Sequence, residues 1–242
     1  MERIVGSSPA GWARLAGALY LIVFVGGFFA LGFVPAATIV AGDPTATARS
    51  IEGHELLYRS GLAAHAVILV ANVPLALLFY YLFHVVDRGI ALLVAALVLV
   101  GTAVETATTF FGVAPLVALS SAQPSTALTS EQALMLVGLP LQVQSIGVAI
   151  ALVFFGFYCL SVGYLVFASG FLPRTIGVLM TIGGLAYLVN SFANLLSPGF
   201  AAHLFPYVLL PSGIAEGSLC LWLLIAAVNV RRWHERAGAV LV

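Results

Sequence analysis

The sequence predicts an all-α fold: a single polytopic domain over residues 1–242 with six transmembrane helices. Hydrophobic residues make up 62% of the chain and charged residues only 7%, whereas soluble globular domains average about 25% charged residues. Six apolar segments are also long enough to cross a bilayer, which takes about 20 helical residues. The composition therefore excludes a soluble fold.

The first span is expected at about residues 12–38. Its apolar run exceeds the roughly 7–15 residues of a signal-peptide core, so we interpret it as a retained membrane helix. Gly26 and Gly27 lie near its middle, where small residues allow neighbouring helices to approach closely.

Residues 42–60 form the most polar loop of the chain. Asp43-Pro44 indicates a helix start, because proline fits the first helical position. Apolar and charged side chains then alternate at helical spacing, which predicts an amphipathic helix lying on the membrane surface.

Turn residues and polar loops delimit the other spans. The stretch from Glu131 to Ala168 is too long for one upright span. We therefore expect a first segment, ending at Leu139, to lie at the interface, and the chain to enter the membrane after Pro140. The remaining spans are expected at about residues 61–86, 90–118, 143–167, 174–196 and 206–229.

Arginines in the connecting segments predict the orientation of the bundle. If the N-terminus is inside, only Arg49 and Arg59 fall in outside loops. The inside segments then hold Arg3, Arg14, Arg88, Arg174, Arg231, Arg232 and Arg236. Because basic residues are enriched in the cytoplasmic loops of membrane proteins, this distribution predicts that both termini are cytoplasmic and that the number of spans is even.

Two carboxyl groups inside spans are the strongest candidates for function. Glu105 and Glu216 lie in otherwise apolar runs, and an acidic side chain at the centre of a membrane helix costs about 2.5–3.5 kcal/mol on insertion scales. Ionisable residues in such positions mark functional sites by default. We therefore take Glu105 and Glu216 as candidate catalytic acids.

Other polar side chains are expected at middle or outer depth in most spans. Polar groups that faced lipid would lack hydrogen-bond partners, so we expect these side chains to converge in a polar chamber that opens toward the outer face. Its candidate substrate-binding residues are His65, Asn72, Thr109, Gln142, Tyr187, Asn190 and Asn194. Hydrogen bonding from helix to helix is an alternative interpretation of the amides.

Several kinds of site find no support in the sequence. Cys159 and Cys220 lie in apolar runs, as small buried side chains do, and no His, Cys or carboxylate spacing typical of a metal site occurs. The net charge is +0, without a basic patch for nucleic acid, and glycine-rich phosphate-binding motifs are absent. We predict no metal, no cofactor and no nucleic-acid partner.

Four stretches of the sequence resemble a known family. They are ARLAGALYLI (13–22), GDPTATARSIEGHELLYRSG (42–61), FGFYCLSVGYLVFASGFLPRTIGVLMTIGGLAYLVNS (155–191) and PSGIAEGSLCLWLL (211–224). They are similar to bacterial membrane proteins grouped as DUF4386, a domain of unknown function. The resemblance implies a multi-pass protein of the bacterial cytoplasmic (inner) membrane with about six helices. It implies no catalytic residue.

Three functions stay open. The chamber favours the binding of a lipophilic small molecule or membrane lipid. An acid-initiated terpene cyclase or isomerase is the enzymatic alternative, in which Glu105 or Glu216 protonates an isoprenoid and aromatic walls stabilise cations. A proton-linked transporter is the third, although the two halves show no inverted repeat. The aromatic walls would be Phe110, Phe111, Phe154 and Tyr187. No pattern in the sequence indicates an oligomeric state.

Overall fold

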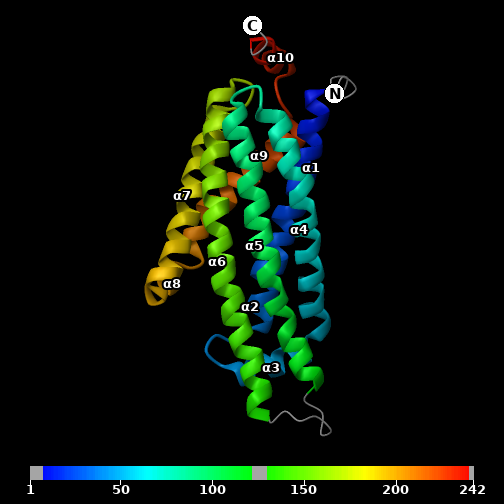
Figure 1. The fold of residues 1–242 in the computed structure, drawn as a ribbon, viewed down its shortest axis with the longest axis vertical. Helices are drawn as coiled ribbons and strands as arrows, with labels where there is room; N and C mark the ends of the chain where they lie inside the picture. The colour runs from blue at the N-terminus through cyan, green and yellow to red at the C-terminus, as the bar shows by residue number, and fades with distance from the viewer. Residues whose placement is uncertain (1–7, 122–129, 240–242) are drawn as a thin grey trace.

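The computed structural model describes residues 8–121 and 130–239, and this part of the chain is almost entirely helical (Figure 1). Its elements in chain order are α1 (Pro9–Gly27), η2 (Phe28–Phe33), α2 (Val34–Thr38), α3 (Pro44–Gly53), α4 (Glu55–Phe83), α5 (Arg88–Ser121), α6 (Ser130–Ser169), α7 (Arg174–Leu196), α8 (Pro198–Leu204), η3 (Tyr207–Leu209), α9 (Leu210–Ile225) and α10 (Val230–Ala239). The η2 segment is a π-helix and η3 a 3₁₀-helix.

Six segments in the described part of the chain are long and apolar enough to cross a membrane. They are Pro9–Thr38, Glu55–Phe83, Arg88–Ser120, Leu134–Ser169, Arg174–Leu196 and Tyr207–Ile225. All six overlap the spans expected from the sequence, which confirms the fold class of a six-span helical membrane bundle.

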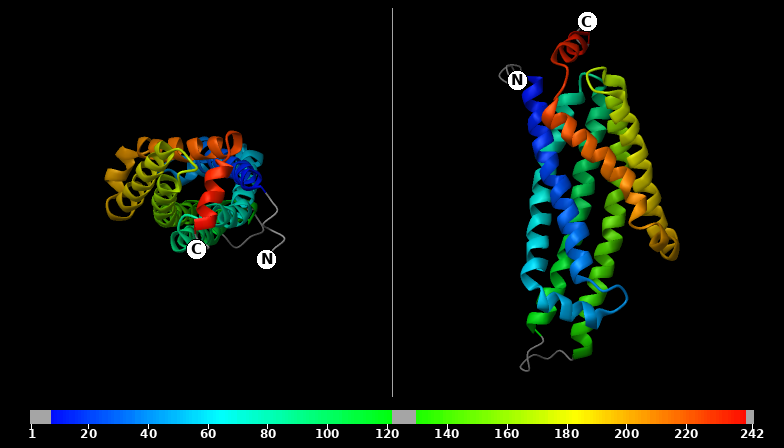
Figure 2. Two further views of the ribbon diagram at one scale, coloured as in Figure 1. Left: turned by 90° about the horizontal axis from the view of Figure 1, so that it is seen from above. Right: turned by 180° about the vertical axis from the view of Figure 1, so that it is seen from behind.

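The spanning helices form a closed ring. α1 packs on α4, α4 on α5, α5 on α6, α6 on α7, α7 on α9, and α9 returns to α1. Figure 2 shows this arrangement from the end and from behind. Both ends of the described chain lie at the same end of the bundle (Figure 1), which we call the termini end. The opposite end, where α3 lies, is the distal end.

Large apolar side chains fill the ring toward the termini end. Phe79, Phe83, Leu165, Met180 and Leu219 are all fully buried in one cluster there. Burying such side chains is worth about 1.5–3 kcal/mol each relative to exposure to water. Within a membrane the gain comes instead from close packing, because lipid is also apolar.

The α6–α7 seam depends on glycine. A Cβ atom on Gly177 would lie 2.7 Å from the carbonyl oxygen of Gly163, and one on Gly184 would lie 2.7 Å from that of Gly156. No side chain can occupy that space, so the two helices touch backbone to backbone. Small residues commonly allow this approach between membrane helices.

The predicted close packing at Gly26–Gly27 holds for one of the two residues. A Cβ on Gly26 would lie 2.9 Å from Cγ1 of Ile68 on α4, whereas Gly27 has nothing within 4 Å.

The sequence predicts a break in the helix at Pro140, and the structure shows a continuous helix there. α6 continues through Pro140 for 40 residues, a length of about 60 Å at 1.5 Å per residue. Its first turns have a packing partner: Val137 is fully buried, and a Cβ on Gly138 would lie 3.1 Å from Pro44 of α3. This contact supports α6 upright beside α5, and both helices extend past α7 at the distal end (Figure 1).

α3 begins where the sequence predicts. The side chain of Asp43 accepts a hydrogen bond of 2.8 Å from the amide of Ala46 at the helix start. Ile51 is fully buried in an apolar cluster with Val34 and Tyr58. Apolar residues of α3 therefore pack on the distal end of the bundle, and its place on the membrane surface stays a prediction.

Candidate functional site

The carboxyl group of Glu216 joins helices that meet where the ring closes. Tyr20 of α1 donates a hydrogen bond of 2.9 Å to Oε1 of Glu216 on α9, and Tyr187 of α7 donates one of 2.7 Å to Oε2. The thiol of Cys159 on α6 lies 3.9 Å from Oε1. We call these four residues the Glu216 centre. All its contacts to the carboxyl group come from hydrogen-bond donors.

Small residues bring the tyrosines within reach of Glu216. A Cβ on Gly17 would lie 2.5 Å from the backbone nitrogen of Leu224, so α1 and α9 touch along their backbones. On the other side, Ser212 donates a hydrogen bond of 2.7 Å to the carbonyl of Gly183, which joins α9 to α7. Glu216 thus lies between two close helix contacts.

The Glu216 carboxyl is the polar end of an aromatic cluster. The Tyr20 ring packs edge-on against Phe79 at 5.7 Å between centroids, and Phe79 lies 6.0 Å from Tyr158. Tyr20, Phe79 and Tyr158 are buried. Glu216 as a residue is only partly buried, and Tyr20, Tyr187 and Cys159 contact its carboxyl group within these largely apolar surroundings.

Glu105 belongs to a second centre, between α4 and α5. Its Oε1 lies 2.9 Å from Nε2 of His65, and both side chains are almost fully buried. Thr109 lies 3.4 Å from Nδ1 of His65 and donates a hydrogen bond of 2.8 Å to the carbonyl of Glu105. We call this group the His65–Glu105 centre. The imidazole gives the carboxyl group a partner that makes its burial tolerable.

The two centres lie at different depths. On α6, a Cβ at Gly147 would contact Thr108 of α5, next to Glu105, whereas Cys159 lies further along the same helix beside Glu216. Gly147 and Cys159 are twelve residues apart on α6, so the two centres are separated by roughly 18 Å along that helix at 1.5 Å rise per residue. They share no hydrogen-bond partner among the described residues. The structure therefore does not bring the two acids into one site.

The predicted amide residues are dispersed. Asn190 and Asn194 bond to each other on α7, where the Nδ2 of Asn194 lies 2.8 Å from the carbonyl oxygen of Asn190. Asn72 is buried on α4, whereas Gln142 is exposed on α6. Gln144, its neighbour, faces α5 instead, where a Cβ on Gly112 would lie 2.7 Å from its Oε1.

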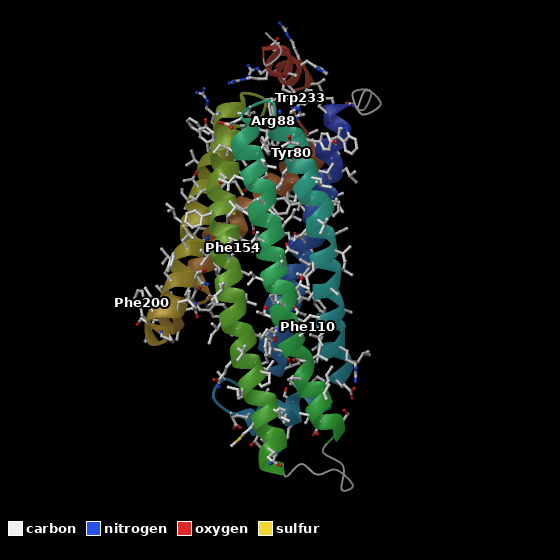
Figure 3. All side chains as sticks on the ribbon, viewed as in Figure 1. Tyr80, Arg88, Phe110, Phe154, Phe200 and Trp233 are labelled. Carbon is white, nitrogen blue, oxygen red and sulfur yellow. The ribbon has the colours of Figure 1, made fainter. Side chains whose placement is uncertain are left out.

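The expected aromatic walls mostly face outward. Phe110 is 74% exposed and Phe111 42% exposed on α5, and Phe154 is half-buried against Gly101. Figure 3 marks Phe110 and Phe154 on their helices. Of the four aromatic residues proposed from the sequence, only Tyr187 lies at a carboxyl group.

Several residues of the two centres were not identified from the sequence. Tyr20 is the residue that the sequence could have identified, because a tyrosine deep in a span needs a hydrogen-bond partner for its hydroxyl group. The apolar run around Cys159 gives no signal for its contact with Glu216. Thr102 lies one turn from Glu105, and its buried hydroxyl has no partner among the described residues.

Metal ligation has no support in the described part of the chain. No group of three or more His, Cys, Asp or Glu side chains lies close enough there to hold an ion.

Comparison with known families identifies the chain at the level of a family. A family described as a domain of unknown function (DUF4386) matches residues 15–227. The chain belongs to the DUF4386 family. Residues 15–227 include both carboxyl centres and all six spans, in whole or in part. No curated protein and no solved structure matches the chain.

Proposed function

We propose that this DUF4386 protein binds a lipophilic small molecule or lipid inside the membrane, and that the Glu216 carboxyl group is its polar anchor. One observation carries the proposal: Glu216 is partly exposed although it lies in a membrane-spanning helix and its neighbours are apolar or aromatic. A carboxyl group inside a membrane is costly unless polar groups satisfy it. A polar group of a bound molecule would add to the hydrogen bonds that Tyr20 and Tyr187 supply.

The hydrogen bonds at Glu216 indicate what the ligand carries. Two carboxylate oxygens accept about four hydrogen bonds; Tyr20 and Tyr187 each supply one, and the Cys159 thiol is a weak third donor. The remaining acceptor positions suit a ligand with a hydroxyl or amine group. Its apolar body would lie against the spanning helices.

Co-purification tests this proposal. The protein would be purified from its native membrane, and the lipophilic molecules bound to it would be extracted and measured by mass spectrometry. We expect the wild type to retain a molecule that Glu216→Gln loses. Glu55→Gln, which changes a half-exposed carboxyl group at the start of α4, should retain it. Equal retention by all three proteins would contradict the proposal.

An acid-initiated cyclase or isomerase is a second candidate, favoured by the aromatic cluster. Tyr20 of the Glu216 centre packs on Phe79, which packs on Tyr158, and aromatic faces stabilise cations. Glu216 would then donate a proton to an alkene or epoxide. Polyprenyl substrates would be assayed with wild type, Glu216→Gln and Glu105→Gln. Unchanged turnover in Glu216→Gln would exclude this reaction at this residue.

We also propose that the termini end faces the cytoplasm of a bacterial cell. Of the arginines in the described chain, Arg49 and Arg59 belong to the distal half. The termini half has Arg14, Arg88, Arg174, Arg231, Arg232 and Arg236. This bias supports the orientation. A fluorescent reporter fused to the C-terminus should be active, and an alkaline phosphatase fusion inactive; the reverse pattern would contradict it.

A further inference from the structure

A cavity of about 420 Å³ lies at the termini end, between two chain connections. One connection, residues 170–173, joins α6 to α7, and the other, residues 226–229, joins α9 to α10. The amide of Asn229 donates a hydrogen bond of 3.2 Å to the carbonyl of Phe171. This contact holds the two connections together beside the cavity.

Side chains of α10 hold it on the bundle by donating hydrogen bonds to carbonyl groups at the ends of other helices. Arg232 donates a hydrogen bond of 2.8 Å to the carbonyl of Gly170, and Arg236 donates one of 2.8 Å to that of Ala168. The indole of Trp233 donates one of 3.0 Å to the carbonyl of Leu82. Carbonyl groups at helix C-termini lack partners within their own helix. α10 therefore sits across the ends of α4 and α6, and Figure 3 marks Trp233 at this end.

The lining of the cavity combines a cationic residue with apolar ones. Arg232 lines the cavity together with Asn229. A guanidinium group has five N–H donors, and the bond to Gly170 uses one of them. Phe171 and Trp222, which is 41% exposed, also line the cavity.

The charge at this end favours an anion. Arg14, Arg88, Arg174, Arg231, Arg232 and Arg236 are the described cations. The described acids are Asp87 and Glu235, and Glu235 is paired with Arg231 at 3.0 Å. A net positive field attracts anionic headgroups at a membrane surface.

An exposed apolar surface leads away from the cavity along α9. Leu221 is 51% exposed, Trp222 41% and Ile225 73%. These residues precede the irregular connection at residues 226–229, so they lie where the span meets its arginine-rich end. A soluble anion would contact only the cationic residue of the cavity, whereas a lipid would contact that residue and this apolar surface.

We propose that this cavity binds an anionic phospholipid. The phosphate group lies against Arg232 and Asn229, and the acyl chains follow Trp222 and the exposed face of α9. This site is independent of the Glu216 centre.

Native mass spectrometry of the whole protein tests the proposal. The protein would be released from nanodiscs that contain equal amounts of phosphatidylglycerol and phosphatidylcholine. We expect one phosphatidylglycerol to stay bound to the wild type, and Arg232→Gln to reduce its occupancy at least about five-fold, as expected for one arginine near a headgroup. Arg231→Gln is the matched control, because it removes the same charge from a side chain that is 88% exposed. Equal losses in both variants would overturn a specific site.

Two further measurements keep the test decisive. Trp222→Ala leaves the hydrogen bonds of α10 intact and should also lower the occupancy of the lipid. It therefore tests the site even if Arg232→Gln separates α10 from the bundle. An excess of inorganic phosphate should not displace the lipid. Displacement by phosphate, or full occupancy in Trp222→Ala, would overturn the assignment to a lipid.

Discussion

The hydroxyl group of Tyr20 in the first span donates a hydrogen bond of 2.9 Å to the carboxyl group of Glu216 in the last. Because α1 and α9 are the helices whose contact closes the ring, this bond joins the two ends of the fold. Tyr187 completes it from α7 on the other side of α9. One carboxyl group thus serves both the closure of the bundle and the proposed binding site.

Removing either tyrosine hydroxyl should weaken ring closure. Tyr20→Phe and Tyr187→Phe each take one donor from Glu216, and we expect each to lower the free energy of unfolding by about 0.5–2 kcal/mol. Reversible unfolding in mixed micelles measures this. Tyr164→Phe is the control: that side chain is 52% exposed, and its loss of a hydroxyl should change the free energy little. An equal effect at Tyr164 would show that the contact to Glu216 is not the cause.

The buried pair of His65 and Glu105 should show strong coupling. Glu105→Leu or His65→Leu alone leaves one buried polar group without its partner, which costs about 1–3 kcal/mol. The double variant replaces both with apolar groups and should be destabilised by less than the sum of the single variants. A double-mutant cycle measures the difference.

The half-exposed pair of Glu55 and Arg59 provides the comparison for that cycle. Its Nε–Oε1 distance is 2.6 Å, but both side chains are more than half exposed. Exposed ion pairs contribute about 0–1 kcal/mol, so Glu55→Gln should be nearly neutral. Additive effects at His65 and Glu105 would contradict a coupled pair.

The α6–α7 seam should reject even one added methyl group. In Gly177→Ala the new Cβ would lie 2.7 Å from the carbonyl oxygen of Gly163 and 2.8 Å from the amide nitrogen of Phe167. Backbone atoms cannot rotate away, so we expect destabilisation of about 1–3 kcal/mol. Gly27→Ala adds the same group where nothing lies within 4 Å, and alanine favours a helix over glycine by up to about 1 kcal/mol. Thermal unfolding should therefore separate the two variants; similar midpoints would contradict the backbone contact.

Much of the fold and part of the site follow from sequence patterns alone. Apolar run lengths predict the six spans, and the rarity of charge inside them singles out Glu105 and Glu216. The hydrogen-bond partners of Glu105 and Glu216 depend on which helices become neighbours. The lengths of the apolar runs do not determine which helices those are. His65 meets Glu105 across the hairpin of α4 and α5, whereas Glu216 meets Tyr20 through the closure of the ring.

The position of α6 shows the same limit. Its length alone suggested a break near Pro140, because one upright span needs only about 20 residues. The contact between Gly138 and Pro44 of α3 supports the extra turns. Such a contact between residues far apart in sequence leaves no periodic signal.

Carbodiimide labelling tests the central claim most directly, namely that the Glu216 carboxyl group is accessible to lipophilic molecules within the membrane. N,N′-dicyclohexylcarbodiimide is an apolar reagent that modifies protonated carboxyl groups, so membranes would be treated at acidic pH and the modified residues identified by peptide mass spectrometry. We predict modification of Glu216 and protection of Glu105, which is only 5% exposed. Modification of Glu105 to an equal or greater extent, or no modification of Glu216, would contradict the account.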